Sequence, residues 1–250
     1  MMKRTSIPML LVAITILTGT LDGDEESEFK SLFNGTDLTG WDGDERFWRV
    51  EDGVIVGQTT AENKAAKNTF LIYRGSEFGD FELRFKYKVE GYNSGMQYRS
   101  VDKGNFVLNG MQADFEARWH KDANRPDAAP TDTFTGMYFE EGGRMFMGQR
   151  GDAVNVHSNP DNPKKPHIEK IGSTGDPTDL EQVIRRDDWN DYTIIASGRL
   201  SVHIINGRVM SLGHDEDDLN FRPKGLIGLQ LHSGPPMRID VKDITIRELR

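Results

Sequence analysis

The sequence predicts an all-β protein, built as a sandwich or jelly roll of short strands. Twenty-six glycines and ten prolines in 250 residues supply the turns that such a fold needs. The segment Phe81–Val89 reads FELRFKYKV and alternates apolar with charged side chains without an error, as a half-buried strand does. Signals of a helix are confined to two short segments, so strands and turns account for most of the chain.

The strand signals follow one another along the chain. The turn residues Glu51–Gly53 lead into the first predicted strand. Asn206–Gly207 has the composition of a type I′ hairpin turn, and Asp243 interrupts the alternation of the last strand as a bulge would. The predicted strands are Val54–Val56, Phe81–Val89, Tyr192–Ala196, Leu200–Ile205, Leu226–Leu231 and Ile239–Leu249.

Helices are predicted at two places. Thr178–Arg186 begins with Thr and ends with two arginines, which complements the helix dipole. Glu62–Lys67 has the composition of a single helical turn. Residues 120–133 and 157–177 are rich in Pro, Asn and Asp and are predicted to be loops.

The N-terminus has the organisation of a secretory signal peptide. Lys3 and Arg4 precede the largely apolar run Met9–Leu17, and small and then acidic residues follow it. The run is too short for a transmembrane helix, which needs about 20 apolar residues. A buried N-terminal helix is the alternative, which the acidic segment that follows disfavours. We expect a signal peptide over residues 1–21, one domain over residues 22–250, a periplasmic or secreted location, and no stable membrane insertion after cleavage.

Composition excludes several classes of function. The chain has no cysteine, which excludes disulfides, thiolate metal sites and a cysteine nucleophile. Its net charge of −9 disfavours nucleic acid as a partner. The sequence contains no P-loop, no dinucleotide fingerprint, no H-E-x-x-H and no G-x-S-x-G nucleophile elbow. The histidines have no spacing typical of a metal pair, and we expect neither a metal nor a cofactor.

Polar residues occupy one face of three further segments with strand character, where apolar residues would be expected. They are Gln97 and Arg99 in Gly95–Ser100, Gln112, Asp114 and Glu116 in Met111–Glu116, and Gln230 and His232 in Gly228–His232. If these strands are neighbours, their side chains form one surface suited to a hydroxyl-rich ligand, because planar amides and carboxylates bind adjacent sugar hydroxyls in pairs. The alternative is that each face is simply exposed to solvent. The exposed face of Phe81–Val89 carries Lys, Arg and Glu instead, which favours a site.

The segment Tyr138–Arg144, which reads YFEEGGR, adds further candidates. Its charged residues Glu140, Glu141 and Arg144 have the pattern of an exposed hairpin end. Alternatively, Glu140 or Glu141 supplies a second carboxylate to the polar cluster.

Six ordered motifs resemble one known family. They are Phe29–Trp41, Trp48–Val54, Gly79–Leu83, Asn93–Gly95, Asp188–Asn190 and Gly228–His232. Together they resemble the 3-keto-disaccharide hydrolase domain, long known as domain of unknown function 1080, and the match spans Phe29 to Leu249. The resemblance implies a concanavalin/LamG-like jelly roll of two antiparallel sheets, found in exported proteins of bacteria that degrade polysaccharides. The segments Gly110–Asp114 and Tyr138–Arg144 look like the version common in marine planctomycetes.

The activity that the resemblance implies is cleavage of glycosides already oxidised to a ketone at C3. The ketone acidifies the C2 proton, so a base can remove it, the C1 aglycone can leave, and water can then add to the enone. This chemistry needs a base near C2, an acid for the leaving oxygen and a donor to the ketone oxygen. The candidates are Asp114 or His232 as base, Glu116 or Glu140 as acid, and Arg99 or Gln112 as donor.

The expected partner is an oligosaccharide or glycoside substrate. The candidate substrate-binding residues are Gln97, Arg99, Gln112, Tyr138, Glu141, Arg144 and Gln230. Two other functions stay open, a non-catalytic, lectin-like carbohydrate-binding module and a structural or adhesive surface domain. The polar strand faces disfavour the last of these, because a packing surface would be more apolar.

Overall fold

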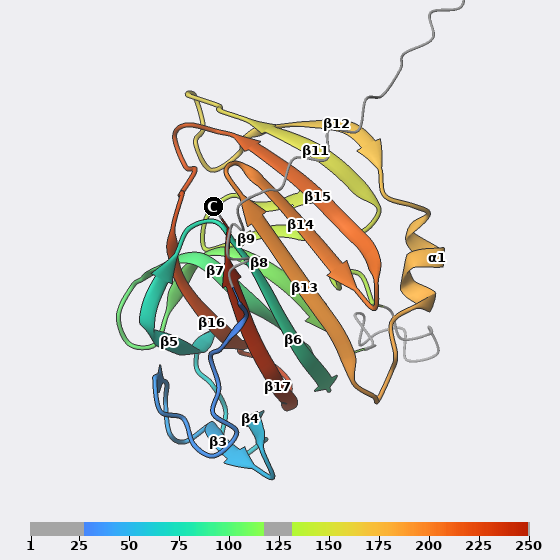
Figure 1. Ribbon diagram of the computed structural model, residues 1–250. Coiled ribbons are helices and arrows are strands. Elements are labelled where there is room, and N and C mark those ends of the chain that lie inside the picture. The colour runs from blue at the N-terminus through green and yellow to red at the C-terminus, as the bar shows by residue number, and fades with distance from the viewer. Residues whose placement is uncertain (1–27, 118–131, 250) are drawn as a thin grey trace, which may run out of the picture.

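The computed structural model describes residues 28–117 and 132–249, which form two β-sheets packed as two layers (Figure 1). In the described part of the chain the larger sheet has ten strands. Nine follow the order β12-β11-β15-β14-β13-β6-β17-β4-β3, and β1 pairs with β17. They are β1 Lys30–Ser31, β3 Trp48–Glu51, β4 Val54–Thr59, β6 Phe81–Glu90, β11 Asp152–His157, β12 His167–Ser173, β13 Asn190–Ser197, β14 Leu200–Ile205, β15 Arg208–Glu216 and β17 Met237–Glu248.

The smaller sheet has seven strands in the order β10-β9-β8-β7-β16-β5-β2, again within the described residues. They are β2 Trp41–Asp42, β5 Thr69–Phe78, β7 Asn93–Asp102, β8 Leu108–Glu116, β9 Tyr138–Glu141, β10 Met145–Gly148 and β16 Gly225–Leu231. The short helix α1, Pro177–Gln182, lies at the side of the sandwich in Figure 1.

The hydrophobic core fills the space between the sheets. Aromatic rings from both layers meet there, because alternate residues of each strand point inward. Phe85 of the larger sheet stacks on Tyr192 at 5.2 Å between ring centroids, and Tyr87 stacks on Phe115 of the smaller sheet at 4.3 Å. The predicted all-β sandwich is confirmed. Its sheets are antiparallel with one exception, because β11 pairs with β15 in parallel.

Several strand predictions are confirmed in detail. The alternating segment forms β6, in which Phe81, Leu83 and Phe85 are buried. Strand β17 has a register shift after Lys242, and Asp243 there adopts a positive φ of 54°, as the break in the alternation predicted. The hairpin between β14 and β15 turns at Asn206 and Gly207, whose φ angles of 48° and 79° fit a type I′ turn.

Three predictions outside the strands are corrected. The helix is shorter than Thr178–Arg186. Asp176 caps its start by accepting a hydrogen bond from the Thr178 N–H, and Asn190 binds the N–H and C=O of Arg185 beyond its end. Glu62–Lys67 forms bends and no helix. Residues 157–177, predicted to be a loop, contain the edge strand β12.

The outer face of the smaller sheet is the one that bears on function. In β8, Met111, Ala113 and Phe115 point into the core, so Gln112 and Asp114 point to the other side of the sheet. The predicted signal peptide, residues 1–21, lies outside the described residues, as do residues 120–131 of a predicted loop. Among the described residues no helix has the length and apolar character needed to cross a membrane.

Candidate functional site

Hydrogen-bonded amide side chains cover part of the outer face of the smaller sheet. Strands β8, β7 and β16 lie side by side, and their register sets Gln97 opposite both Gln112 and Gly228. Gln97 Nε2 donates to Gln112 Oε1 at 3.2 Å, and Gln112 Nε2 donates to Gln230 Oε1 at 3.4 Å. All three glutamines are almost fully buried. The three polar strand segments are therefore neighbours, which was the condition for a shared site.

Gly95 leaves the space in which the Gln112 side chain lies. The glycine is paired with Asp114, and a Cβ atom on it would come within 2.6 Å of Gln112 Cγ. Because this space is free, Gln112 lies over the glycine and its Nε2 donates to Asp114 Oδ1 at 3.1 Å. A larger residue at position 95 would displace the amide that holds the carboxyl group.

The network borders a pocket of ≈ 200 Å³, which we call the Asp114 pocket. Its walls combine polar and aromatic side chains. The polar residues are Asn68, Asn93, Gln112, Asp114, Glu141 and His232, and the apolar ones are Tyr92, Phe134, Met137, Phe139, Met145 and Phe146. Four candidates from the sequence, Gln112, Asp114, Glu141 and His232, therefore line one pocket. Gln97 and Gln230 belong to the network beside it.

Asp114 is the most buried acid of the pocket and is 1% exposed. Its Oδ1 accepts hydrogen bonds from Gln112 Nε2 and from Asn93 Nδ2 at 3.3 Å, whereas Oδ2 has no hydrogen-bond partner among the described residues. Burial raises the pKa of Asp114 well above its usual range, and the nearby carboxylates of Glu141 and Glu116 act in the same direction. The two amide hydrogen bonds oppose this shift without reversing it.

His232 lies just after the end of β16 and is partly exposed. Its Nδ1 is 2.6 Å from the carbonyl oxygen of Ser233, which can only accept, so Nδ1 carries the proton. In the neutral ring Nε2 then holds a lone pair. Tyr92 packs edge-on against the imidazole at 5.0 Å between ring centroids and limits its rotation.

Glu141 and Asn68 connect the pocket to distant segments. Gln230 Nε2 donates to Glu141 Oε2 at 3.0 Å, and Asn68 Nδ2 is 3.4 Å from Glu141 Oε1. Asn68 also accepts from the backbone N–H of Ser233, next to His232, at 2.9 Å. Sequence reasoning missed Asn68, because nothing in its neighbourhood indicates that it meets strands so far along the chain.

An aromatic wall completes the pocket. Phe139, Phe134 and Phe146 lie together, with centroids 5.2 Å apart for Phe139–Phe146 and 5.8 Å for Phe134–Phe146. Phe146 is 52% exposed, which is unusual for a phenylalanine. An exposed ring beside polar groups suits a ligand with both C–H faces and hydroxyls. Sequence reasoning also missed these rings. Alternation along Tyr138–Glu141 could have placed Phe139 on the same face as the candidate Glu141, and in the sheet Phe139 lies opposite Gln112.

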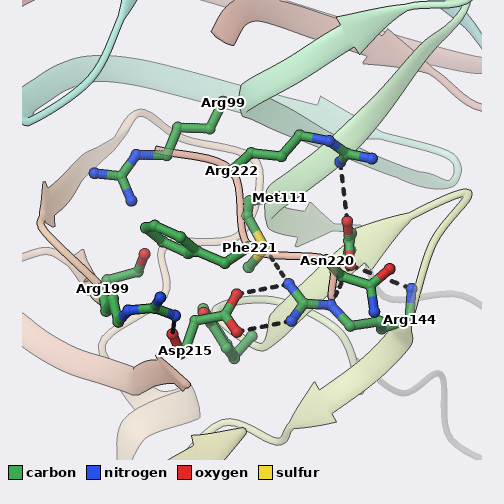
Figure 2. Close-up of a pocket in the computed structure, with 11 residues that line it drawn as sticks. Arg99, Met111, Arg144, Arg199, Asp215, Asn220, Phe221 and Arg222 are labelled. Atoms are coloured by element: carbon green, nitrogen blue, oxygen red, sulfur yellow. Dashed lines mark hydrogen bonds and ion pairs between the residues drawn. The ribbon is translucent and has the colours of Figure 1, made fainter. Parts of the chain in front are cut away.

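Arg144 is the centre of a second charged cluster, which Figure 2 shows at close range. Its guanidinium binds Asp215 through two hydrogen bonds of 2.8 and 2.7 Å, and it also contacts Glu140 and Asp217. Burial works to lower the pKa of Arg144, but the hydrogen bonds and charges of Asp215 and Glu140 outweigh it and raise the pKa. The cavity at this cluster is only ≈ 10 Å³, about the space of one water molecule, so we interpret the cluster as structural.

Five of the predicted site residues lie outside the Asp114 pocket and the glutamine network beside it. Along β9 the residues alternate, so Phe139 and Glu141 face the Asp114 pocket while Tyr138 and Glu140 point to the opposite side of the sheet. Tyr138 packs in the core. Glu140 binds Arg144 and Arg222, the latter at 3.1 Å. The guanidinium of Arg144 donates hydrogen bonds to Glu140 and Asp215. None of the three lines the Asp114 pocket.

Arg99 is the fourth predicted site residue outside the Asp114 pocket. It was predicted to share a strand face with Gln97, but its φ of 47° breaks the alternation of side chains along β7, which shifts register against β8 at this point. The Arg99 side chain instead binds the carbonyl oxygens of Gly79 and Gly198 and the carboxylate of Asp80. It therefore ties together two turns and is not part of the pocket.

Glu116 is the fifth such residue, because it shares the strand face of Asp114 but does not line the Asp114 pocket. Its carboxylate accepts hydrogen bonds from the backbone N–H groups of Thr133 and Phe134, the latter at 2.9 Å. It lines a neighbouring cavity of ≈ 550 Å³. Its carboxylate thus anchors the chain that leads into β9.

His203 is a titratable core residue that the pocket does not use. It is fully buried, its Nε2 is 3.0 Å from the hydroxyl of Tyr98, and its Nδ1 is 3.0 Å from the Met137 carbonyl oxygen. Burial lowers the pKa of His203 to about 4, against the opposing effect of the hydrogen bond to Met137.

This buried imidazole makes a prediction about acid stability. The unfolded chain binds the His203 proton at its ordinary pKa of 6.5, so the free energy of unfolding should fall as pH drops from 6.5 to about 4. The full contribution is about 3 kcal/mol. Urea denaturation of wild type and His203→Gln at both pH values measures it, and the variant should lose less stability on acidification. Equal acid losses in the two proteins would contradict the assignment.

The residues in the two described ranges include no group of three or more His, Asp or Glu side chains placed to hold a metal ion. The Asp114 pocket offers instead one imidazole, two carboxyl groups, three amides and an aromatic wall. This is the class of site that suits a small, hydroxyl-rich ligand on a β-sandwich.

Comparison with known proteins gives the family. The chain belongs to the family of 3-keto-alpha-glucoside-1,2-lyase-like domains, and the model of this family matches residues 28–247. A comparison with curated proteins found no match.

Two solved structures share the fold, both from Parabacteroides distasonis ATCC 8503 and both named a "putative glycosyl hydrolase". One is 17% identical, with a TM-score of 0.56, and the similarity covers 89% of this chain and 94% of that chain. The other is 19% identical, with a TM-score of 0.54, and covers 89% of this chain and 100% of that chain.

Proposed function

We propose that this chain binds a neutral 3-keto-glycoside in the Asp114 pocket and cleaves its C1–O bond by elimination between C1 and C2. One observation carries the proposal. A histidine with one fixed proton and a deeply buried aspartic acid line the same small pocket, together with amides and aromatic rings. Family membership supports a glucoside lyase activity of this kind.

The pocket favours a single neutral sugar ring. Its ≈ 200 Å³ is below the roughly 300–1,000 Å³ of drug-sized sites, so a longer chain would extend out of it. Phe146 at the wall can cover a C–H face of the ring, and the amides of Asn68 and Asn93 can bind hydroxyls. The carboxylate of Glu141 and the net charge of −9 disfavour an anionic sugar.

The reaction needs no covalent intermediate. A base takes the proton from C2 and leaves an enolate on the C3 oxygen. The C1–O bond then breaks, a C1=C2 double bond forms and the C3 ketone is restored. The proton lost from C2 is balanced by one gained on the leaving oxygen, so the products are an enone and an alcohol. Addition of water to the enone gives the free 3-keto sugar.

We assign the base to His232. Nε2 holds a lone pair when Nδ1–H is bound to Ser233, and a partly exposed ring can reach the end of the sugar that carries the aglycone. The imidazolium that forms can return its proton to the leaving oxygen. Glu141 is less suited, because both of its oxygens already accept hydrogen bonds from amides. Asp114 is also less suited, because burial raises its pKa and favours its neutral form.

Two further assignments belong to this proposal. Export to the periplasm or medium would place the protein where glycans are degraded, and it depends on the predicted signal peptide over residues 1–21. Membership in the planctomycete-type version of the family also stays a prediction.

The test is incubation with a glucoside that carries a chromogenic aglycone, in the 3-keto form and in the unoxidised form, with both anomers. Release of the aglycone from the keto form alone is expected, because only the ketone makes the C2 proton acidic. Release from both forms would indicate direct hydrolysis instead. Binding by calorimetry without any release would indicate a lectin-like module.

A further inference from the structure

Asp114 lines the pocket although it is only 1% exposed, and its two carboxyl oxygens differ in their hydrogen bonding. Both of the hydrogen bonds that it accepts are on Oδ1, from Asn93 and Gln112, while Oδ2 is buried without a hydrogen-bond partner among the described residues. A buried polar atom without a partner is costly, and such atoms mark positions where a ligand completes the hydrogen bonding. Oδ2 is therefore the atom of Asp114 left for the ligand.

The surroundings of Asp114 favour its neutral form. The hydrogen bonds to Oδ1 come from uncharged amides, and the charges that act on it most are the carboxylates of Glu141 and Glu116, which repel a further negative charge. The imidazole of His232 and the phenol of Tyr92 also line the pocket. With Oδ1 accepting two hydrogen bonds, the carboxyl proton has its place on Oδ2.

Gln112, the other candidate donor from the sequence, already uses both of its N–H groups within the protein. Its Nε2 has two hydrogens, and it donates to Asp114 Oδ1 at 3.1 Å and to Gln230 Oε1 at 3.4 Å. The Gln112 amide therefore holds Asp114 in place and cannot at the same time bind the ligand.

We propose that neutral Asp114 donates its Oδ2–H to the C3 carbonyl oxygen of the bound sugar and to the enolate that forms on that oxygen. This inference rests on the proposed function. The aglycone on C1 must leave through the mouth of the pocket, beside the exposed Phe146, so the ring edge remote from C1 faces the enclosed end. Asp114 thus meets the sugar's own oxygens, while His232, which is more exposed than Asp114, is left to reach C2.

A neutral carboxylic acid suits this position for two reasons. It is a stronger hydrogen-bond donor than an amide, and a donor strengthens its bond as negative charge develops on the acceptor. An ionised carboxylate in the same place would repel the enolate. Donation from a fixed, buried group also needs no rearrangement when the proton leaves C2.

Two variants of similar size distinguish this role from that of a base. Asp114→Asn keeps an N–H donor in the place of Oδ2 and a carbonyl oxygen in the place of Oδ1, so its kcat on the 3-keto-glucoside should stay within about 10-fold of wild type. Asp114→Leu removes the donor, and its kcat should fall by roughly 10²- to 10³-fold. Urea midpoints of both variants check that they fold. If Asp114→Asn is as inactive as Asp114→Leu, an ionised carboxylate is required and the inference is overturned.

A second measurement needs no substrate. An infrared difference spectrum of wild type minus Asp114→Asn at pH 7 should contain the C=O band of a protonated carboxyl group. Its absence overturns the inference even if wild type releases the aglycone as proposed. If the band is present but wild type leaves the 3-keto-glucoside intact, the proposed function fails, and the donor role toward the C3 oxygen fails with it.

Discussion

Replacing His232 with glutamine is expected to lower kcat for a 3-keto-glucoside by roughly 10²- to 10⁴-fold, the usual contribution of a positioned general base. Glutamine can still donate a hydrogen bond to the Ser233 carbonyl oxygen, which His232 Nδ1 contacts at 2.6 Å. It has no nitrogen lone pair of comparable basicity, however, so the C2 proton has no acceptor. The measurement is single-turnover release of a chromogenic aglycone.

Exchange of the C2 hydrogen gives an independent readout. In D₂O the wild-type protein should catalyse incorporation of deuterium at C2, and His232→Gln should not. His167→Gln is the matched control, because His167 is exposed on the edge strand β12, away from the pocket. Unchanged exchange in His232→Gln would show that another residue is the base, and Glu141 would be the first alternative.

The fold could be predicted where one physical cause dominates the sequence. One face of strand β6 packs in the core and the other faces solvent, so apolar and charged residues alternate over Phe81–Val89. The edge strand β12 has no buried face, so its composition matches a loop. Backbone pairing and exposed side-chain contacts, such as that of Lys170 with Asp152, hold it to β11. The helix α1 ends at Gln182, and Asn190, which lies beyond the predicted end of the helix, binds the backbone of Arg185 in a non-helical segment.

The site could be predicted in part for the same reason. Alternation along a regular strand places Gln112 and Asp114 of β8 on one face. The strand that carries Gln97 is the next one in the sheet, and the strand that carries Gln230 lies beyond it. The positive φ of Arg99 breaks the rule, because residues other than glycine seldom adopt it and the sequence does not mark it.

Two other features of the site depend on tertiary structure alone. The second strand of the β9–β10 hairpin brings Phe146 beside the pocket, and a loop before β5 brings Asn68. Neither position has a local signal. The raised pKa of Asp114 likewise follows from its burial and not from the residues next to it in the sequence.

Arg144→Met should destabilise the protein by about 3–5 kcal/mol, because it leaves the buried carboxylates of the second charged cluster without their main cation. The Arg144 side chain is 2% exposed, and its partners Glu140, Asp215 and Asp217 are exposed by 5% or less. Arg222 remains beside Glu140, but Asp215 loses the two hydrogen bonds that Figure 2 shows. Urea denaturation at pH 7 measures the change.

Arg74→Met is the matched control for this loss. Arg74 also binds two carboxylates, those of Asp42 and Asp102, but its side chain is 36% exposed, so its removal should cost no more than about 1 kcal/mol. The folded fraction of Arg144→Met should cleave a 3-keto-glucoside with wild-type kcat, since Arg144 lies apart from the Asp114 pocket. A loss of kcat without a loss of stability would instead place Arg144 in the reaction, as the sequence pattern alone had suggested. The two readouts therefore separate a charge that holds the sandwich together from the groups that act on the sugar.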